Sequence, residues 1–245
     1  MRIQQKAESL MNKFIFDVDG TITPSRQPIN SKFKNFFKDF CRDNKVFLVT
    51  GSDKPKTIEQ IGEDIYNMAH TVYNCNGNDV WQGKKHIRKN DWWLKNTEKQ
   101  WLENMLEKSK FQLRTGLHFE SRPGMINFSI VGRNANQEER KQYVEWDQSI
   151  NERQFIVKAF NTTFPFLEAK IGGETGIDIS PKGFDKSQIV KDFNKDDVLW
   201  FFGDAIYEGG NDYPLAQVVH NYRKVDRWQQ TKEYLEIFQD EGIAN

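Results

Sequence analysis

Two short apolar runs in this sequence end abruptly at polar residues and glycine. Residues 14–16 lead into Asp17-Val18-Asp19-Gly20-Thr21, and residues 46–49 lead into Thr50-Gly51-Ser52. The segment between them begins with a candidate N-cap, Asn30-Ser31, and carries phenylalanines at helical spacing: Phe33, Phe36, Phe37 and Phe40. A buried strand, a helix and a second buried strand predict a parallel sheet. Ligands of such sheets bind beyond the carboxyl ends of the strands.

Chemically reactive side chains follow the apparent strands in a fixed order. They are Asp17 and Asp19, then Thr50 and Ser52, then Lys186, and finally Asp204 with Asp212. Two carboxylates at positions i and i+2 of a tight turn repel each other unless a cation lies between them. Asp17 and Asp19 therefore indicate a Mg²⁺ site, to which Asp204 adds a third carboxylate. Each motif alone could be an ordinary turn, but all of them in this order make a much stronger signal.

The character of the chain changes between about Gly83 and Gly183. The elements expected there are amphipathic helices at residues 98–108 and 137–160 and strands at 125–131 and 166–171. Outside this segment we expect a helix through Ile58, Ile61 and Ile65 and a last helix at 226–238. We also expect strands at 71–73 and 198–202, and both strands lead into polar residues. We expect a parallel-sheet α/β core formed by residues 12–82 and 184–245. Residues 83–183 would form an inserted α+β layer.

Taken together, the motifs resemble those of the haloacid dehalogenase superfamily of phosphotransferases. The resemblance implies a Rossmann-like core with an inserted cap domain of the C2 type. Asp17 would be the nucleophile that forms an aspartyl phosphate, with Asp19 as acid and base and Lys186 offsetting negative charge. Thr50 or Ser52 would donate a hydroxyl to the phosphoryl group. The implied Mg²⁺ ligands are Asp17, Asp19, Asp204 and Asp212. Of these, Asp212 would mainly orient the water ligands of the metal.

Three arginine-containing segments resemble the cap of the eukaryotic-type phosphomannomutases. They are Arg122-Pro123-Gly124-Met125-Ile126-Asn127, Ile130-Val131-Gly132-Arg133 and Gln137-Glu138-Glu139-Arg140. Further matches to that family, at residues 16–27, 51–53, 183–186 and 201–212, extend the resemblance over about residues 12–213. It implies that Arg122, Arg133 and Arg140 hold the distal phosphate, that Asp178 bonds sugar hydroxyls and that Arg26 contacts phosphate from the core. It also implies a hexose 1,6-bisphosphate activator and a homodimer formed through the cap.

The expected function is interconversion of mannose 1-phosphate and mannose 6-phosphate through an aspartyl phosphate and a hexose bisphosphate. The alternative enzyme is a Mg²⁺-dependent sugar-phosphate phosphatase, in which water replaces the sugar hydroxyl as acceptor. The three arginines favour the mutase, although they could instead form surface ion pairs with Glu138, Glu139 or Glu145. A non-catalytic binding module is disfavoured because it needs no nucleophile together with an acid and base.

Composition excludes several other classes of function. The charges of the 35 basic and 35 acidic residues cancel, so the protein has no net positive charge that would attract it to nucleic acid or to an anionic membrane. The basic segment 84–89 with Trp92-Trp93 resembles stacking surfaces of nucleic-acid binders, but we interpret it as a solvated cap hairpin beside packed aromatics. No apolar run approaches the ~20 residues of a membrane helix. Two distant cysteines, Cys41 and Cys75, suit a reducing compartment, so we expect a soluble cytoplasmic enzyme.

Overall fold

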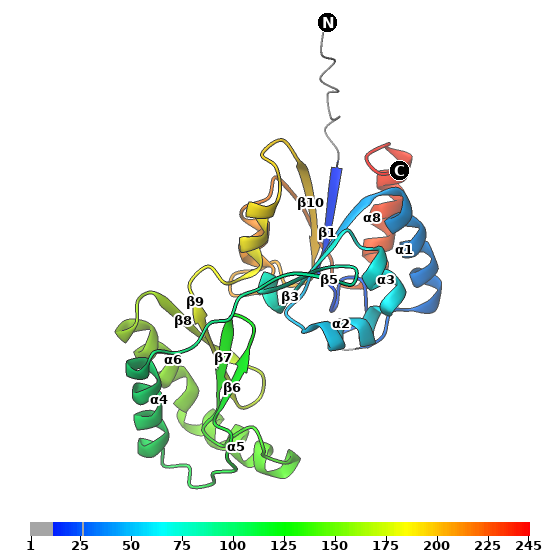
Figure 1. The fold of residues 1–245 in the computed structure, drawn as a ribbon. Coiled ribbons are helices and arrows are strands. Elements are labelled where there is room, and N and C mark those ends of the chain that lie inside the picture. The colour runs from blue at the N-terminus through cyan, green and yellow to red at the C-terminus, as the bar shows by residue number, and fades with distance from the viewer. Residues whose placement is uncertain (1–11, 26) are drawn as a thin grey trace, which may run out of the picture. The chain divides into compact units, whose positions relative to one another are not determined.

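The computed structural model describes residues 12–25 and 27–245, which form two compact units (Figure 1). The first unit comprises the described residues up to Lys89 together with Phe184–Asn245, and the second comprises Asn90–Gly183. The chain thus leaves the first unit and returns to it. Each unit has its own sheet and its own apolar core.

The first unit is built on a seven-stranded sheet of order β11-β10-β1-β2-β3-β4-β5. Its strands are β1 (Asn12–Phe16), β2 (Lys45–Val49), β3 (Thr71–Asn74), β4 (Asp79–Gln82), β5 (Lys85–Lys89), β10 (Val198–Gly203) and β11 (Asn221–Lys224). The strands from β11 through β3 are parallel, whereas β4 and β5 are antiparallel. The predicted α/β fold with a parallel sheet is therefore confirmed.

The helices of the first unit cover its sheet and bury the aromatic residues that predicted them. They are α1 (Ser31–Asp43), α2 (Lys54–Ile61), α3 (Glu63–Met68), α7 (Tyr213–Ala216) and α8 (Trp228–Asp240), with the short 3₁₀ helices η1 (Cys75–Gly77) and η2 (Lys186–Asp192). Asn30 caps α1, because its side chain accepts hydrogen bonds from the backbone of Lys32 and Phe33. The helix expected through Ile58 and Ile65 is two helices, since Gly62 between them adopts a φ of 86°.

The second unit contains an antiparallel sheet of order β6-β7-β9-β8. Its elements are β6 (Phe119–Arg122), β7 (Met125–Phe128), β8 (Leu167–Gly172), β9 (Gly176–Pro181), α4 (Asn96–Lys108), α5 (Gln137–Ile150) and α6 (Glu152–Thr163). The three helices pack against one face of the sheet, where Phe128, Ile177 and Ile179 join one apolar cluster. The single helix expected at 137–160 is two helices, because Asn151 has a φ of 56°.

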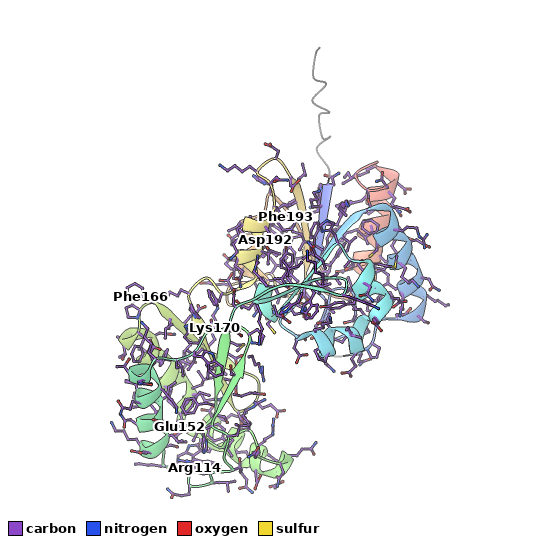
Figure 2. All side chains as sticks on the ribbon, viewed as in Figure 1. Arg114, Glu152, Phe166, Lys170, Asp192 and Phe193 are labelled. Atoms are coloured by element: carbon purple, nitrogen blue, oxygen red, sulfur yellow. The ribbon has the colours of Figure 1, made fainter. Side chains whose placement is uncertain are left out.

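The segment with basic residues 84–89 belongs to the first unit, not to the inserted layer. β5 pairs with β4 as the last strand of the first sheet. Arg88 forms a forked ion pair at 2.9 and 2.7 Å with Asp192, which lies at the end of η2 and is labelled in Figure 2. The boundary expected after Gln82 therefore lies after Lys89. Trp92 packs on the second core, whereas Trp93 is exposed. The interpretation of residues 84–89 as a cap hairpin is wrong.

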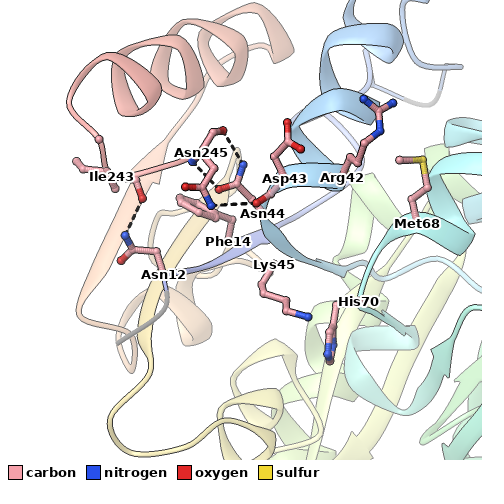
Figure 3. A pocket seen from close by; sticks show the side chains of 12 residues that line it. Asn12, Phe14, Arg42, Asp43, Asn44, Lys45, Met68, His70, Ile243 and Asn245 are labelled. Atoms are coloured by element: carbon pink, nitrogen blue, oxygen red, sulfur yellow. Dashed lines mark hydrogen bonds between the residues drawn. The ribbon is translucent and has the colours of Figure 1, made fainter. Parts of the chain in front are cut away.

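A cavity of about 470 Å³ lies at the amino ends of β1 and β2 (Figure 3). Asn12 and Lys45, the first residues of these strands, line it together with His70. Because Asp17 follows the opposite end of β1, this cavity does not belong to the residues that the sequence motifs single out. No helix in the described part of the chain is long and apolar enough to cross a membrane.

Candidate active site

Asp17 follows β1 directly and is held in a turn with little room. Its backbone N–H donates to the carbonyl of Phe202 at 2.9 Å, which continues the pairing between β1 and β10. Gly20 has a φ of 83°, and a Cβ atom there would lie 2.3 Å from Oδ2 of Asp204. The Thr21 hydroxyl donates to Oδ2 of Asp17 at 3.3 Å. The turn thus brings the carboxylates that follow β1 and β10 side by side.

Lys186 lies between two buried carboxylates. Its Nζ donates to Oδ1 of Asp17 at 2.5 Å and to Oδ1 of Asp212 at 2.6 Å, and all three side chains are almost fully buried. Burial alone would lower the pKa of Lys186, but the charges of Asp17 and Asp212 outweigh it and raise this pKa above its ordinary value. Asp212 also accepts from the backbone N–H of Ala205 through Oδ2. Both oxygens of Asp212 therefore have protein partners.

Asp17, Asp204 and Asp212 form a compact acidic cluster. One carboxylate oxygen of each lies within 4.8 Å of the other two. Burial raises the pKa of Asp17 to about 8; the Lys186 ammonium opposes this rise and the Asp212 carboxylate adds to it. Burial and the Asp212 charge likewise raise the pKa of Asp204 to about 6. One ammonium does not balance three carboxylates, so this all-oxygen donor set fits a hard divalent cation such as Mg²⁺.

Asp19 lies outside that cluster, although it is only two residues from Asp17. Its Oδ1 accepts a hydrogen bond from Nε2 of Gln60 on α2 at 3.0 Å. Among the described residues, the acidic cluster contains Asp17, Asp204 and Asp212 but not Asp19. The carboxylate of Asp19 is thus positioned separately from the acidic cluster, and its predicted place among the metal ligands is not seen in that cluster. Gln60 gave no signal in the sequence, because it is one of many polar residues on an amphipathic helix.

Thr50 and Ser52 follow β2 at the same edge of the sheet. The Oγ1 atom of Thr50 accepts from the backbone N–H of Ser52 at 3.1 Å, and the Thr50 side chain is buried. The backbone of this loop is bonded to η1, since Asn76 donates to Thr50 and Cys75 to Ser52. Thr50 therefore shapes the loop, and half-buried Ser52 is the better-placed hydroxyl donor of the two.

Lys186 begins η2 and does not follow a strand, contrary to the expectation for its motif. Asp185 caps this helix by accepting from the Ser187 backbone at 2.8 Å. Gln188 donates to the carbonyl of Asn76 at 2.8 Å, and Asn78 donates to that of Phe184 at 3.2 Å. These bonds tie η2 to η1 and so fix the start of η2 and the Lys186 side chain.

In the second unit, a row of polar side chains crosses the sheet on the face away from the helices. The strand register places Glu120 opposite Asn127, Asn127 opposite Asp178, and Asp178 opposite Lys170. Lys170, on β8, is labelled in Figure 2. Nδ2 of Asn127 donates to Oδ1 of Asp178 at 2.6 Å. Lys170 forms an ion pair with Glu168 at 2.9 Å. Among these four residues, the sequence motifs singled out only Asp178 as a site residue.

The three predicted arginines lie in the second unit, and two of them share one carboxylate. Arg122 donates to Oε2 of Glu120 at 2.8 Å, and Nε of Arg133 lies 2.9 Å from the same oxygen without hydrogen-bond geometry. Nε of Arg140 donates to the carbonyl of Ala135 at 3.0 Å. Two of the arginines therefore form ion pairs, as the alternative interpretation expected, but their partner is Glu120 and not a glutamate of α5. Arg26 lies outside the described residues.

Comparison with known proteins identifies the family. A model of the family described as "Eukaryotic phosphomannomutase" matches residues 33–238. Phosphomannomutase of Saccharomyces cerevisiae is 31% identical over 222 residues, which cover 86% of this chain and 86% of the yeast protein. The enzyme of that name from Encephalitozoon cuniculi is 32% identical over 243 residues, or 87% of this chain and 92% of the relative.

Solved structures with low sequence identity share the fold. A C-terminally truncated IMP-nucleotidase of Plasmodium falciparum superposes with a TM-score of 0.57 at 17% identity, covering 92% of this chain and 70% of the nucleotidase. A haloacid dehalogenase-like hydrolase from Bacteroides thetaiotaomicron gives a TM-score of 0.55 at 12% identity, covering 93% and 100% of the two chains. The family match and these folds lead to one assignment. The chain belongs to the eukaryotic phosphomannomutase family of enzymes.

Proposed function

We propose that this protein is a phosphohexomutase that interconverts mannose 1-phosphate and mannose 6-phosphate. One observation carries the proposal: the buried Asp17 carboxylate lies against the Lys186 ammonium and two further carboxylates, at the carboxyl end of a central parallel strand. Membership of the phosphomannomutase family supports the choice of substrate. Mg²⁺ is the proposed cation, and a hexose 1,6-bisphosphate the proposed activator. A cytoplasmic homodimer formed through the second unit is the proposed state of the enzyme.

In the proposed reaction, Asp17 attacks the phosphorus of the substrate and becomes an aspartyl phosphate. Lys186, held between Asp17 and Asp212, offsets negative charge on the transferring group. When bound by Asp17 and Asp204, with Asp212 beside them, Mg²⁺ supplies further positive charge to the phosphoryl oxygens. Ser52 and backbone N–H groups of the neighbouring loops donate hydrogen bonds to these oxygens.

Asp19 is the proposed acid and base. It protonates the leaving alkoxide when Asp17 is phosphorylated, and it later removes the proton from the sugar hydroxyl that takes up the phosphoryl group. The hydrogen bond from Gln60 holds its carboxylate apart from the acidic cluster. This separation lets Asp19 exchange a proton while Asp17 remains the nucleophile.

A mutase must hold the second phosphate of a hexose bisphosphate away from the nucleophile. We assign this task to Arg122, Arg133 and Arg140, because guanidinium groups can bind phosphate in a forked geometry. Glu120 pairs with Arg122 and Arg133, so a bound phosphate would replace this carboxylate as their partner. Asp178 is the proposed acceptor for sugar hydroxyls.

The test is incubation with Mg²⁺, mannose 1-phosphate and a catalytic amount of glucose 1,6-bisphosphate, with mannose 6-phosphate and free phosphate both followed over time. Mannose 6-phosphate should be the main product. Free phosphate as the main product would instead identify a sugar-phosphate phosphatase. Asp17→Asn should abolish turnover with the fold retained, whereas Asp240→Asn, the same change at an exposed carboxylate, should not alter it.

A further inference from the structure

The loop that follows β1 is closed on one backbone carbonyl. The carbonyl of Val18 accepts hydrogen bonds at 3.3, 3.1 and 3.1 Å from three backbone N–H groups, those of Thr21, Ile22 and Thr23. The hydroxyl of Thr23 donates to the same oxygen at 3.1 Å. Because these bonds hold residues 18–23 together, a contact that fixes one residue of the loop also fixes the side chains of the others.

A side chain of the last helix holds this loop from outside. The hydroxyl of Thr231 on α8 donates to the carbonyl of Thr21 at 2.6 Å, and both residues are fully buried. The two residues are 210 positions apart in the sequence. The bond therefore forms only when α8 packs onto the core, and it then ties the catalytic loop to the end of the chain.

Thr231 is a polar residue on a buried helix face that is otherwise apolar. Leu235 and Phe238, which are also buried on α8, belong to the apolar core of the first unit. A hydroxyl in such surroundings costs free energy unless it is hydrogen-bonded, and valine would fill the same space without that cost. Threonine in a helix can donate to the carbonyl four residues earlier, but Thr231 donates to the loop. The hydroxyl thus serves the loop more than the helix.

Thr21 connects this bond to the carboxylate of Asp17. The Thr21 hydroxyl donates to Oδ2 of Asp17 at 3.3 Å, whereas Oδ1 accepts from Lys186 at 2.5 Å. The contact to Oδ2 is already longer than the roughly 3.0 Å at which O–H···O hydrogen bonds usually end. A small outward shift of the Thr21 backbone would therefore break it and leave the orientation of the Asp17 carboxylate to Lys186 alone.

We propose that Thr231 is a positioning residue for the nucleophile. By holding the carbonyl of Thr21, it keeps the Thr21 hydroxyl against Oδ2 of Asp17 and so fixes the angle at which the carboxylate meets the substrate phosphorus. Attack on phosphorus depends steeply on this geometry. The last helix thereby contributes to the reaction without touching the substrate. The inference rests on the proposed function, because it takes Asp17 as the nucleophile.

The test measures kcat and KM for mannose 1-phosphate and for p-nitrophenyl phosphate, which lacks the sugar. Thr231→Val, which has the same shape without the hydroxyl, should lower kcat roughly tenfold for both substrates with little change in KM. Thr231→Ser, which keeps the hydroxyl, should restore kcat. The matched control is Thr71→Val, at a buried threonine on the first residue of β3 whose hydroxyl accepts from Gln82 at 3.3 Å. It should lower the melting temperature but leave kcat unchanged.

The coupling between positions 21 and 231 gives a second test. If Thr231 acts through the Thr21 hydroxyl, adding Thr231→Val to Thr21→Val should lower kcat no further. Additive effects would overturn the inference, as would a Thr231→Val variant that loses stability but keeps its kcat. Thr231→Ala takes the place of the valine variant if that variant does not fold. Free phosphate as the main product of the wild type would contradict the proposed mutase function, and kcat for phosphate release in the same variants would still decide the inference.

Discussion

Replacing Lys186 by methionine should strongly destabilise the first unit. Lys186 is fully buried and contacts Asp17 and Asp212 at 2.5 and 2.6 Å. Methionine keeps the apolar stem but leaves two buried carboxylates without their cation. Removing one partner of a buried ion pair costs about 3–5 kcal/mol, a large part of the 5–15 kcal/mol that stabilises an ordinary domain.

The pH dependence of this loss follows from the pKa of each group. The pKa of Lys186 is raised by Asp17 and Asp212 despite its burial, so its contribution is complete below its unfolded pKa and is lost only at higher pH. At about pH 9, which lies below the unfolded pKa of lysine and above the pKa of about 8 to which burial raises Asp17, the full effect should therefore be visible. It should shrink as the pH falls through 8, because burial raises the pKa of Asp17 to about 8 and its carboxyl group is then increasingly protonated. Added Mg²⁺ should restore part of the stability by supplying positive charge to the same carboxylates.

The assay is urea unfolding at about pH 9, followed by tryptophan fluorescence and by circular dichroism. Lys195→Met, the same change at an exposed lysine, is the control and should have little effect. Adding Asp212→Asn to Lys186→Met should recover part of the loss, because one uncompensated charge is removed. A loss below about 1 kcal/mol in Lys186→Met would refute the reasoning, because buried carboxylates would then tolerate the absence of the ammonium.

Three further changes test other contacts. Burial would raise the pKa of Asp64, but hydrogen bonds from Lys34 and Lys38 lower it to about 2. The stability that these bonds provide is present above about pH 4 and is lost as the pH falls through 2. Because Asp64 is 39% exposed, Asp64→Asn should cost at most about 1 kcal/mol in urea unfolding at pH 7 and less than that at pH 2. Gly20→Ala should weaken Mg²⁺ binding by roughly tenfold in calorimetry, because its Cβ would displace Asp204; unchanged affinity would contradict that packing. Arg153→Met should lower stability by about 3–5 kcal/mol, and an unchanged melting curve would show that its ion pair is not needed.

The inner parallel strands of the first sheet could be predicted from the sequence because they are largely buried on both faces. β1, β2, β3 and β10 are short apolar runs that end at polar residues. β5 and β11 were missed because their sequences, Lys-His-Ile-Arg-Lys and Asn-Tyr-Arg-Lys, belong to strands at the edges of the sheet, where charged residues are common. Such strands carry no apolar pattern.

Helix breaks were also beyond the sequence pattern. Apolar spacing continued through Gly62 and Asn151, although both residues adopt positive φ angles and end one helix before the next begins. Glycine and asparagine tolerate this conformation, but they do not require it. Packing of the following helix against the core decides whether the break occurs.

The sequence by itself determined where the acidic group of Asp17 lies. Its acidic motif follows an apolar strand, and the parallel strands it predicts bring Asp17 and Asp204 to the same sheet edge. Only the tertiary structure decided which groups bind the other predicted site residues. Gln60 donates to Asp19, Glu120 pairs with Arg122, and Asn127 donates to Asp178. Such partners depend on strand register and helix docking, which arise when residues distant in the chain pack together. The local order of side chains specifies a reactive group, but long-range packing specifies its partners.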